Sequence, residues 1–370
     1  MFDPDATPGG FGRFKDSARL SRCLWLGAFL AGGFATAVLA DGANAQPGVS
    51  ELAKEVAHKG WILFSAQTPQ GDYDLFLSRP DGSVKRNLTQ TADWNEYGGR
   101  FSLDGKRMLY RRQHKPTEPV QGQIINHDSW GARGTLVIAN AHGSNPQLQG
   151  EDGEFPWASW SPDGKQIACL YKREGVIRIF ELESKKLVKE MPRQGIFQQM
   201  FWSPDGKRLC GTANVNGQDW NVVSIDLETG ANTLLTRNLN CTADWFQRDS
   251  NRVIYSNRTG GLASEYGWTM LMQATADGKS RTLIYGELGR HIYYGCTSPD
   301  DKYAIFATPE SDGGTDANMA IIRLADAPIV VPDDYVELRS LYPSAKSGPV
   351  LRLDQPGFEP HWTYTEVGAK

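Results

Sequence analysis

Four histidines lie in the irregular stretches between the apolar runs of this chain, where side chains are available for ligand binding. They are His114, His127, His291 and His361. Two or three imidazoles that converge with a carboxylate are the usual protein ligands of zinc or manganese. No two of these histidines have the short spacing of a local metal motif. We therefore expect no cofactor, and the alternative is a divalent cation that the fold assembles from His127, His291 and His361.

The other candidate ligand-binding residues are carboxylates and aromatic residues in the same stretches: Trp94, Glu96, Asp128, Trp130, Glu154, Tyr293 and Glu359. Mixed aromatic and acidic side chains suit a polar ligand such as a sugar or a peptide, or a cation. The competing interpretation is that these residues form turns and solvate the ends of loops, as polar residues do on many protein surfaces.

The sequence lacks the motifs of the enzymes that most often use repeated β-sheet folds. It has no G-x-S-x-G of a serine hydrolase and no S-x-D-x-G-x-T-W box of a sialidase. It also has no C-x-x-C, which excludes zinc ribbons, thioredoxin-type redox sites and c-type haem attachment. These absences favour a binding protein over an enzyme.

The composition excludes partners that need a strong positive field. The 370 residues carry 39 basic and 43 acidic side chains, a net charge of −4, so we expect no nucleic-acid partner. A basic segment precedes the apolar run 23–40, and Ala43-Asn44-Ala45 has the small-residue pattern of a cleavage site. We predict a secretory signal peptide over residues 1–45, a periplasmic or secreted protein, and no membrane span after cleavage. An uncleaved anchor is the alternative, because about 18 apolar residues can just cross a bilayer.

Four cysteines lie outside the predicted leader: Cys169, Cys210, Cys241 and Cys296. In an oxidising compartment they have the number needed for two disulfides. Cys169 and Cys210, however, lie inside apolar runs, where a thiol packs as a small hydrophobic side chain. We therefore favour buried thiols.

A short turn sequence recurs along the chain. Its clear copies, aligned on the aromatic residue before the turn, begin at Phe101, Trp160 and Trp202 and read F-S-L-D-G-K, W-S-P-D-G-K and W-S-P-D-G-K. Weaker copies begin at Phe246 and Thr297. Proline pre-sets φ for the second position of a turn, and glycine accepts the positive φ at its exit. Each copy therefore predicts a hairpin between two strands.

Two further apolar runs follow each hairpin, which makes four strands per unit. The N-terminal part supplies only the second, third and fourth strands, near 62–64, 75–77 and 85–89, and a sixth aromatic residue, Trp362, marks an unpaired strand at the other end. A C-terminal strand that completes the N-terminal sheet closes a ring and hides its edges. We predict an all-β, six-bladed β-propeller of four-stranded blades over residues 61–370, after a short segment at 46–60.

Three inserts interrupt the repeats, at 113–133, 309–317 and 332–348. Loops from second to third strands, and from each blade to the next, share one face, where propeller sites usually form. We expect the candidate residues on that face and interpret the recurring turns as structural joints. The third insert is predicted to form a helix. If residues 328–331 form the last outer strand, which we favour, the helix lies on this same face. If residues 350–353 form that strand, the helix lies on the opposite face.

The repeated W-S-P-D-G-K between apolar strands resembles the TolB-type, WD-repeat-like β-propellers of bacterial envelope proteins, without the N-terminal α/β domain of TolB itself. The resemblance implies a propeller over nearly the whole chain, but a propeller hosts many functions. We expect a non-catalytic module that binds an envelope protein or a saccharide, or a subunit of an envelope assembly. The enzymatic alternative is a metal-dependent polysaccharide lyase resembling oligogalacturonate lyase.

Overall fold

A computed structural model describes residues 48–115, 134–150, 157–171, 173–215, 218–237, 239–258, 269–287, 289–310, 317–324, 329–330 and 348–368. The predicted leader, most of the insert at 113–133, residues 311–316 and the predicted helix lie outside these ranges. Among the residues described, no helix has the length and apolar character needed to cross a membrane. In the same part of the chain, all four cysteines are buried and none forms a disulfide.

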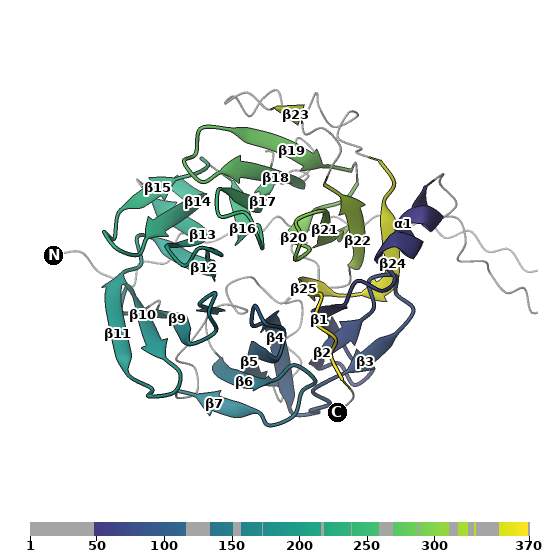
Figure 1. The fold of residues 1–370 in the computed structure, drawn as a ribbon, viewed down its shortest axis with the longest axis horizontal. Coiled ribbons are helices and arrows are strands. Elements are labelled where there is room, and N and C mark those ends of the chain that lie inside the picture. The colour runs from purple at the N-terminus through teal and green to yellow at the C-terminus, as the bar shows by residue number, and fades with distance from the viewer. Residues whose placement is uncertain are drawn as a thin grey trace, which may run out of the picture. The chain divides into compact units, whose positions relative to one another are not determined.

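Six antiparallel sheets follow one another around a ring, which confirms the predicted six-bladed propeller (Figure 1). From inner to outer strand, blade 1 contains β25 (Phe358–Thr363), β1 (Trp61–Gln67), β2 (Tyr73–Ser78) and β3 (Lys85–Asn87). Blade 2 contains β4 (Trp94–Phe101), β5 (Arg107–His114), β6 (Thr135–Asn140) and β7 (Gln147–Gln149). Blade 3 contains β8 (Trp157–Trp160), β9 (Gln166–Tyr171), β10 (Val176–Glu181) and β11 (Leu187–Pro192).

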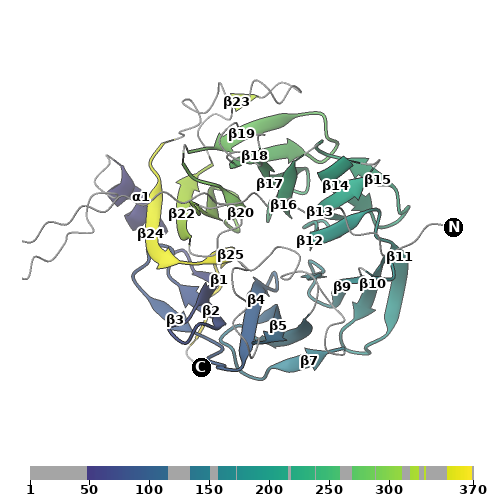
Figure 2. The same ribbon diagram turned by 180° about the vertical axis from the view of Figure 1, so that it is seen from behind.

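The second half of the ring repeats this order, as the view from behind also shows (Figure 2). Blade 4 contains β12 (Ile196–Trp202), β13 (Arg208–Val215), β14 (Gln218–Asp226) and β15 (Asn232–Leu234). Blade 5 contains β16 (Asn240–Trp245), β17 (Arg252–Arg258), β18 (Thr269–Thr275) and β19 (Arg281–Tyr285), with β23 (Ile329–Val330) at its outer edge. Blade 6 contains β20 (Tyr293–Thr297), β21 (Tyr303–Ala307), β22 (Asn318–Arg323) and β24 (Leu351–Pro356).

The C-terminal strand completes the N-terminal blade, as predicted. β25 pairs antiparallel with β1, and Trp362 lies opposite Ile62. The Trp362 side chain is fully buried, and its indole N–H donates to the carbonyl oxygen of Lys59 at 2.7 Å. Beyond the strand, the guanidinium of Arg79 donates to both carboxylate oxygens of Glu366, at 2.9 and 3.0 Å. These contacts join the two ends of the propeller.

The recurring turn is held by its own serine and aspartate. In the copy after Trp202, the hydroxyl of Ser203 donates to the carboxylate of Asp205 at 2.6 Å, and the same oxygen accepts the N–H of Lys207 at 3.0 Å. Gly206 closes the turn with a φ of 75°, a conformation that glycine adopts without strain. The equivalent bonds occur in the turns after Phe101 and Trp160, so the repeated residues are explained by turn geometry.

The fourth copy of the turn is displaced by one residue from our alignment, which was wrong at Phe246. The inner strand β16 ends at Trp245, because this turn holds one more residue than the others. The indole N–H of Trp245 donates to the carbonyl oxygen of Phe201 in the preceding blade at 3.1 Å. Trp160 donates in the same way to Arg100 at 3.2 Å. Trp245 is therefore the aromatic residue of the repeat.

The outer strand of blade 6 is β24, so our preference for residues 328–331 was wrong. β24 pairs with β22, with Ile321 opposite Leu351, whereas β23 extends the edge of blade 5, with Leu283 opposite Ile329. Alternate residues of β24 are buried, among them Leu351 and Leu353, and this pattern specifies a half-buried strand better than the length of the preceding turn does. The insert therefore precedes the outer strand.

A short helix before the propeller was missed in the sequence. α1 (Val49–Val56) buries Val49, Leu52 and Val56 beside β24. Its Glu55 accepts hydrogen bonds from the hydroxyl of Tyr303 and from the guanidinium of Arg323. The apolar residues at positions i, i+3 and i+7 are the signal of an amphipathic helix.

Five of the six inner strands carry a bulge at the same place, three residues before the repeat position that is aromatic in four of them and Thr297 in blade 6. The residues there have left-handed φ angles: Gly98 (62°), Gln199 (44°), Thr242 (50°), Tyr294 (57°) and Glu359 (51°). At each of them the pairing register with the neighbouring strand shifts. Such bulges bend a strand and redirect its side chains, here those that follow the bulge toward the channel.

Replacing Gly98 by alanine is expected to lower the free energy of unfolding by about 2 kcal/mol. A left-handed φ costs about 1–2 kcal/mol for a residue with a Cβ, and a Cβ here would lie 3.0 Å from Nη2 of Arg111 and 3.3 Å from Oε2 of Glu359. Gly175→Ala is the control, because Gly175 has a φ of 75° with no atom within 4 Å of the added Cβ. Urea unfolding that shows equal losses for both variants would contradict the role of the crowded site.

Candidate functional site

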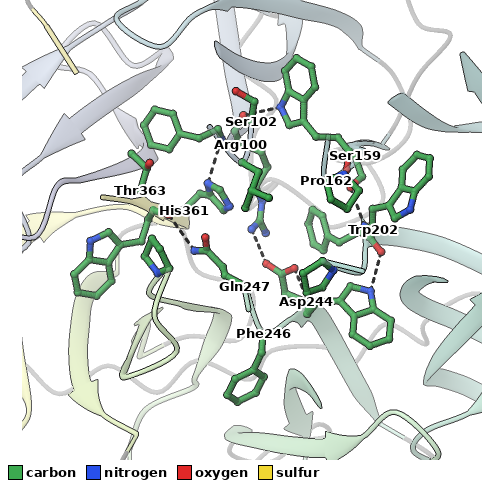
Figure 3. A pocket seen from close by; sticks show the side chains of 18 of the residues that line it. Arg100, Ser102, Ser159, Pro162, Trp202, Asp244, Phe246, Gln247, His361 and Thr363 are labelled. Atoms are coloured by element: carbon green, nitrogen blue, oxygen red, sulfur yellow. Dashed lines mark hydrogen bonds and ion pairs between the residues drawn. The ribbon is translucent and has the colours of Figure 1, made fainter. Parts of the chain in front are cut away.

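A cavity of about 360 Å³ opens at the end of the central channel where the recurring turns lie (Figure 3). We call it the cup. Inner strands of five blades contribute to it, β4, β8, β12, β16 and β25, each through the last residues before its turn. The turns therefore surround the cup, whereas the inserts at 113–133 and 309–317 follow the second strands β5 and β21, at the ends opposite to the turns.

An ion pair forms the floor of the cup. Nη1 of Arg100 in blade 2 lies 2.6 Å from Oδ2 of Asp244 in blade 5, and the two side chains are 13% and 12% exposed. These blades are opposite one another in the ring, so the pair spans the channel. Burial raises the pKa of Asp244, and Arg100 opposes that shift. The guanidinium also lies 3.9 Å from the ring centre of Phe201, a favourable cation–π distance.

His361 lies beside this ion pair in the cup. Its Nδ1 accepts the backbone N–H of Phe101 in the next blade at 3.1 Å, so the ring proton of the neutral imidazole is on Nε2. Burial, with a further contribution from Arg100, holds the pKa of His361 well below its usual value. The imidazole is therefore neutral at physiological pH, and its Nε2–H is a hydrogen-bond donor.

Aromatic side chains form the wall of the cup. They are the repeat residues Phe101, Trp160, Trp202, Trp245 and Trp362. All but Trp202 are buried, so little of their ring surface is open to the cavity. The wall is therefore apolar and rigid.

The mouth of the cup has an apolar collar from the second residue of each turn. The collar consists of Leu103, Pro162, Pro204 and Pro299. Leu103 is 58% exposed, the highest value among the large exposed hydrophobic residues of the described chain. Apolar residues held at a cavity mouth are a common feature of sites that bind another molecule.

Exposed lysines surround the collar. Lys106, Lys165, Lys207 and Lys302 each come near the end of a turn and are exposed. The aspartate of the same turn accepts hydrogen bonds within the turn, and at Asp163 those from Ser161 and Lys165 lower its pKa. A lowered pKa keeps Asp163 ionised, so this turn presents an exposed lysine beside an exposed carboxylate.

Of the residues predicted from the sequence, His361 lines the cup. Tyr293 lies in a buried cluster with Phe358, and Glu359, the next residue of β25, is also buried. Glu359 pairs with Arg111 at 3.4 Å, with side chains 4% and 3% exposed. Burial raises the pKa of Glu359, and Arg111 opposes the shift. Neither residue reaches the cup.

Trp94, His114 and His291 lie toward the opposite end of the channel from the cup. The rings of Trp94 and His114 stack with centres 3.7 Å apart, and His291 stacks on Tyr293 at 5.8 Å. His127, Asp128, Trp130 and Glu154 lie outside the described residues. A ligand role for the residues at this end stays a prediction.

The three candidate histidines that lie in the described ranges occupy three separate environments. His114 is exposed at the end of β5, His291 is buried before β20, and His361 is in the cup. Within the described ranges, no three or more His, Cys, Asp and Glu side chains form a group that could hold a metal ion. The arrangement of His127 relative to them lies outside those ranges, so the cation alternative stays a prediction.

Glu96 is a buried carboxyl at the opening of blade 2. It is 1% exposed, and its Oε1 accepts a hydrogen bond from Thr91 at 2.5 Å. Burial raises the pKa of Glu96 to about 8, and the neighbouring Asp74 adds to the rise. Glu96 is therefore protonated at neutral pH.

Glu96→Gln is expected to raise the free energy of unfolding by about 2–3 kcal/mol at pH 7. The folded state keeps Glu96 protonated while the unfolded state ionises above its ordinary pKa, so folding loses stability as the pH rises from about 4.5 to 8. Glutamine removes that loss, and the gain should vanish at pH 4. Urea unfolding at both pH values checks this, with the exposed Glu228→Gln as the control. A gain that does not depend on pH would contradict the assignment.

Sequence reasoning missed most of the residues of the cup. Arg100 and Asp244 occupy the same place in their strands, one residue before the repeat aromatic, which is also the place of Ser159, Phe201 and His361. Reading down this column of the aligned repeats shows residues of unlike type, four of them charged or polar and one, Phe201, aromatic. Variation of residue type at one fixed position of the repeat was the feature of the sequence that could have indicated a site there.

Comparisons with known proteins agree on the fold. No family model and no curated protein matches the sequence. Among solved structures, the chain is similar to TolB from Acinetobacter baumannii, with 16% identity, a TM-score of 0.59, and 82% of this chain and 67% of that chain covered. A putative TolB from Agrobacterium tumefaciens has 17% identity, a TM-score of 0.49, and coverages of 73% and 87%. A chain of the nidogen–laminin complex has 10% identity, a TM-score of 0.51, and coverages of 72% and 89%. The protein is therefore a β-propeller of the TolB type in its fold.

Proposed function

We propose that this chain is an exported, non-catalytic propeller that binds a partner protein through the cup, as a binding module or a subunit of an envelope assembly. The observation that carries the proposal is the combination of an apolar collar at the mouth with hydrogen-bond donors on the floor. Sites with apolar walls and a few placed polar groups are typical ligand sites. The predicted leader supports a periplasmic or extracellular location.

The polar groups of the cup favour binding over catalysis. The hydroxyl of Ser159 accepts the N–H of Trp202 at 2.9 Å, and Nδ1 of His361 accepts the N–H of Phe101. Asp244 pairs with Arg100. Nucleophilic catalysis needs a hydroxyl or thiol bonded to a base, and in the cup the hydroxyl of Ser159 and Nδ1 of His361 each accept a backbone N–H of the next blade instead.

A peptide fits the cup better than a saccharide does. Sugar rings bind by stacking on open aromatic faces, and the wall residues Phe101, Trp160, Trp245 and Trp362 are buried. Leucine and proline around the mouth suit apolar side chains of a peptide. A saccharide ligand and the lyase-like activity stay alternatives that the experiment below can detect.

Capture of partners by immobilised protein tests the proposal. Leu103→Arg places a charge in the collar, and Val188→Arg makes the same change at a 50% exposed residue on the outer strand of blade 3. From an envelope extract of the source organism, a protein retained by the wild type should be lost with Leu103→Arg and kept with Val188→Arg. Equal retention by both variants, or turnover of uronate oligosaccharides by the purified protein, would contradict the proposal.

A further inference from the structure

We propose that the floor of the cup binds the C-terminal carboxylate of a peptide chain, with Arg100 and His361 as the donors. This inference rests on the proposed binding function and adds the chemistry of the ligand to it. Four features of the cup carry it: the unused donors of the guanidinium, the tautomer of the imidazole, the closed floor and the charges around the mouth.

Arg100 has donors to spare. Its Nη1 donates to Asp244, and among the residues described neither Nε nor Nη2 has a hydrogen-bond partner. The side chain is nevertheless 13% exposed, in the cavity. A guanidinium presents its N–H groups as a fork that matches the two oxygens of a carboxylate. Asp244 therefore occupies only Nη1, and the other donors belong to a side chain that lines the cavity.

His361 supplies a second donor beside that fork. Because Nδ1 accepts the N–H of Phe101, Nε2 carries the proton. The imidazole is half-buried and lines the same cavity. A neutral N–H next to a cation can donate to a carboxylate without adding a second buried charge. The two donors together predict an anionic ligand group on the floor.

The closed floor favours binding of the C-terminus of a peptide over binding of an internal segment. The ion pair joins opposite blades across the channel, and the buried cluster of Tyr293 and Phe358 lies beneath it. The cup of about 360 Å³ is near the small end of ligand pockets, which are roughly 300–1,000 Å³. A main chain that enters such a cavity ends there, and capture of a terminal carboxylate is a recurring mode of peptide recognition.

The mouth is complementary to the same ligand. Leu103 and the three prolines of the collar can contact the side chains that precede the terminus. The exposed lysines of the same turns, such as Lys165 and Lys207, are cations that can pair with an anionic group of the peptide at short range. Apolar contacts at the mouth and donors on the floor thus suit one peptide C-terminus.

Two matched peptide pools test the inference on the wild-type protein. The probes are N-acetylated random octapeptides, synthesised once with a free C-terminal carboxylate and once as the amide, and captured on the immobilised protein. Captured sequences are then made in both forms, and their Kd is measured by calorimetry. We expect the free acid to bind at least tenfold more tightly, as hydrogen bonds to a charged group do.

Two variants assign the effect to the floor. Arg100→Met with Asp244→Leu replaces the ion pair by apolar side chains and should reduce the acid-to-amide ratio to about one. Asp244→Asn frees Arg100 from its internal partner and should tighten acid binding if the variant folds. If Asp244→Asn does not fold, the acid-to-amide ratio of the double variant tests the inference instead.

Four results would overturn the inference: equal affinity of acid and amide, dependence on an internal Asp or Glu rather than on the terminus, an unchanged ratio in the double variant, or no peptide captured from either pool. The proposed function is tested separately, because Leu103→Arg reports on the cup whatever chemical group the floor binds.

Discussion

Replacing Asp244 by asparagine is expected to lower the free energy of unfolding by about 3 kcal/mol. Arg100 would keep its charge in a mostly buried place without a carboxylate, and loss of one partner of a buried ion pair typically costs about 3–5 kcal/mol. The remaining 13% exposure of Arg100 places the expected loss at the lower end. Chemical unfolding at pH 7, followed by tryptophan fluorescence, measures it.

The control for Asp244→Asn is the double variant Arg100→Met with Asp244→Leu. Removing both charges leaves no unpaired group, so much of the lost stability should return. If Asp244→Asn lowers the free energy of unfolding by less than about 0.5 kcal/mol, the ion pair does not stabilise the contact between the opposite blades.

Replacing Trp362 by alanine is expected to cost about 3–5 kcal/mol. The side chain is fully buried between blade 1 and its neighbour, and its indole N–H bonds to the carbonyl oxygen of Lys59. Large-to-small changes of buried aromatic residues typically cost this amount. The loss should appear as local opening, with faster hydrogen exchange of the β1 and β25 amides than of blade 4.

Trp202→Ala is the matched control for Trp362→Ala. Trp202 occupies the same position of the repeat in blade 4 but is only half-buried, and its strand is joined to the rest of its blade by a continuous chain. We expect a smaller loss and no selective opening of blade 1. Uniform exchange across all blades in Trp362→Ala would contradict the idea that this strand closes the ring.

The fold was predictable because its signals are local and repeated. Turns such as Ser203 to Lys207 carry their own capping bonds, so each copy identifies a hairpin whatever surrounds it. The spare strand at Trp362 then identified the closure. The alignment was wrong at Phe246 because one added turn residue shifts the repeat, and the outer strand was wrong because turn length was given more weight than the burial pattern of β24.

The cup was not predictable in the same way, because its parts are far apart in the sequence. Arg100 and Asp244 meet only when blades 2 and 5 are opposite in a closed ring. The bulge that precedes Asp244 is also hidden, since Thr242 is a residue type that rarely adopts a left-handed φ. We expected a binding site at the inserts that interrupt the repeat. The cavity instead lies among the turns that match the repeat most closely.

The most direct test of the cup as the binding site is a titration of the purified protein with a captured peptide, followed by the indole N–H signals in NMR. Trp160 and Trp202 line the cup, whereas Trp94 and Trp220 lie toward the other end of the channel. We predict saturable shifts of the Trp160 and Trp202 signals, with those of Trp94 and Trp220 unchanged. Shifts confined to Trp94 and Trp220 would contradict the account and place binding at the opposite end of the channel.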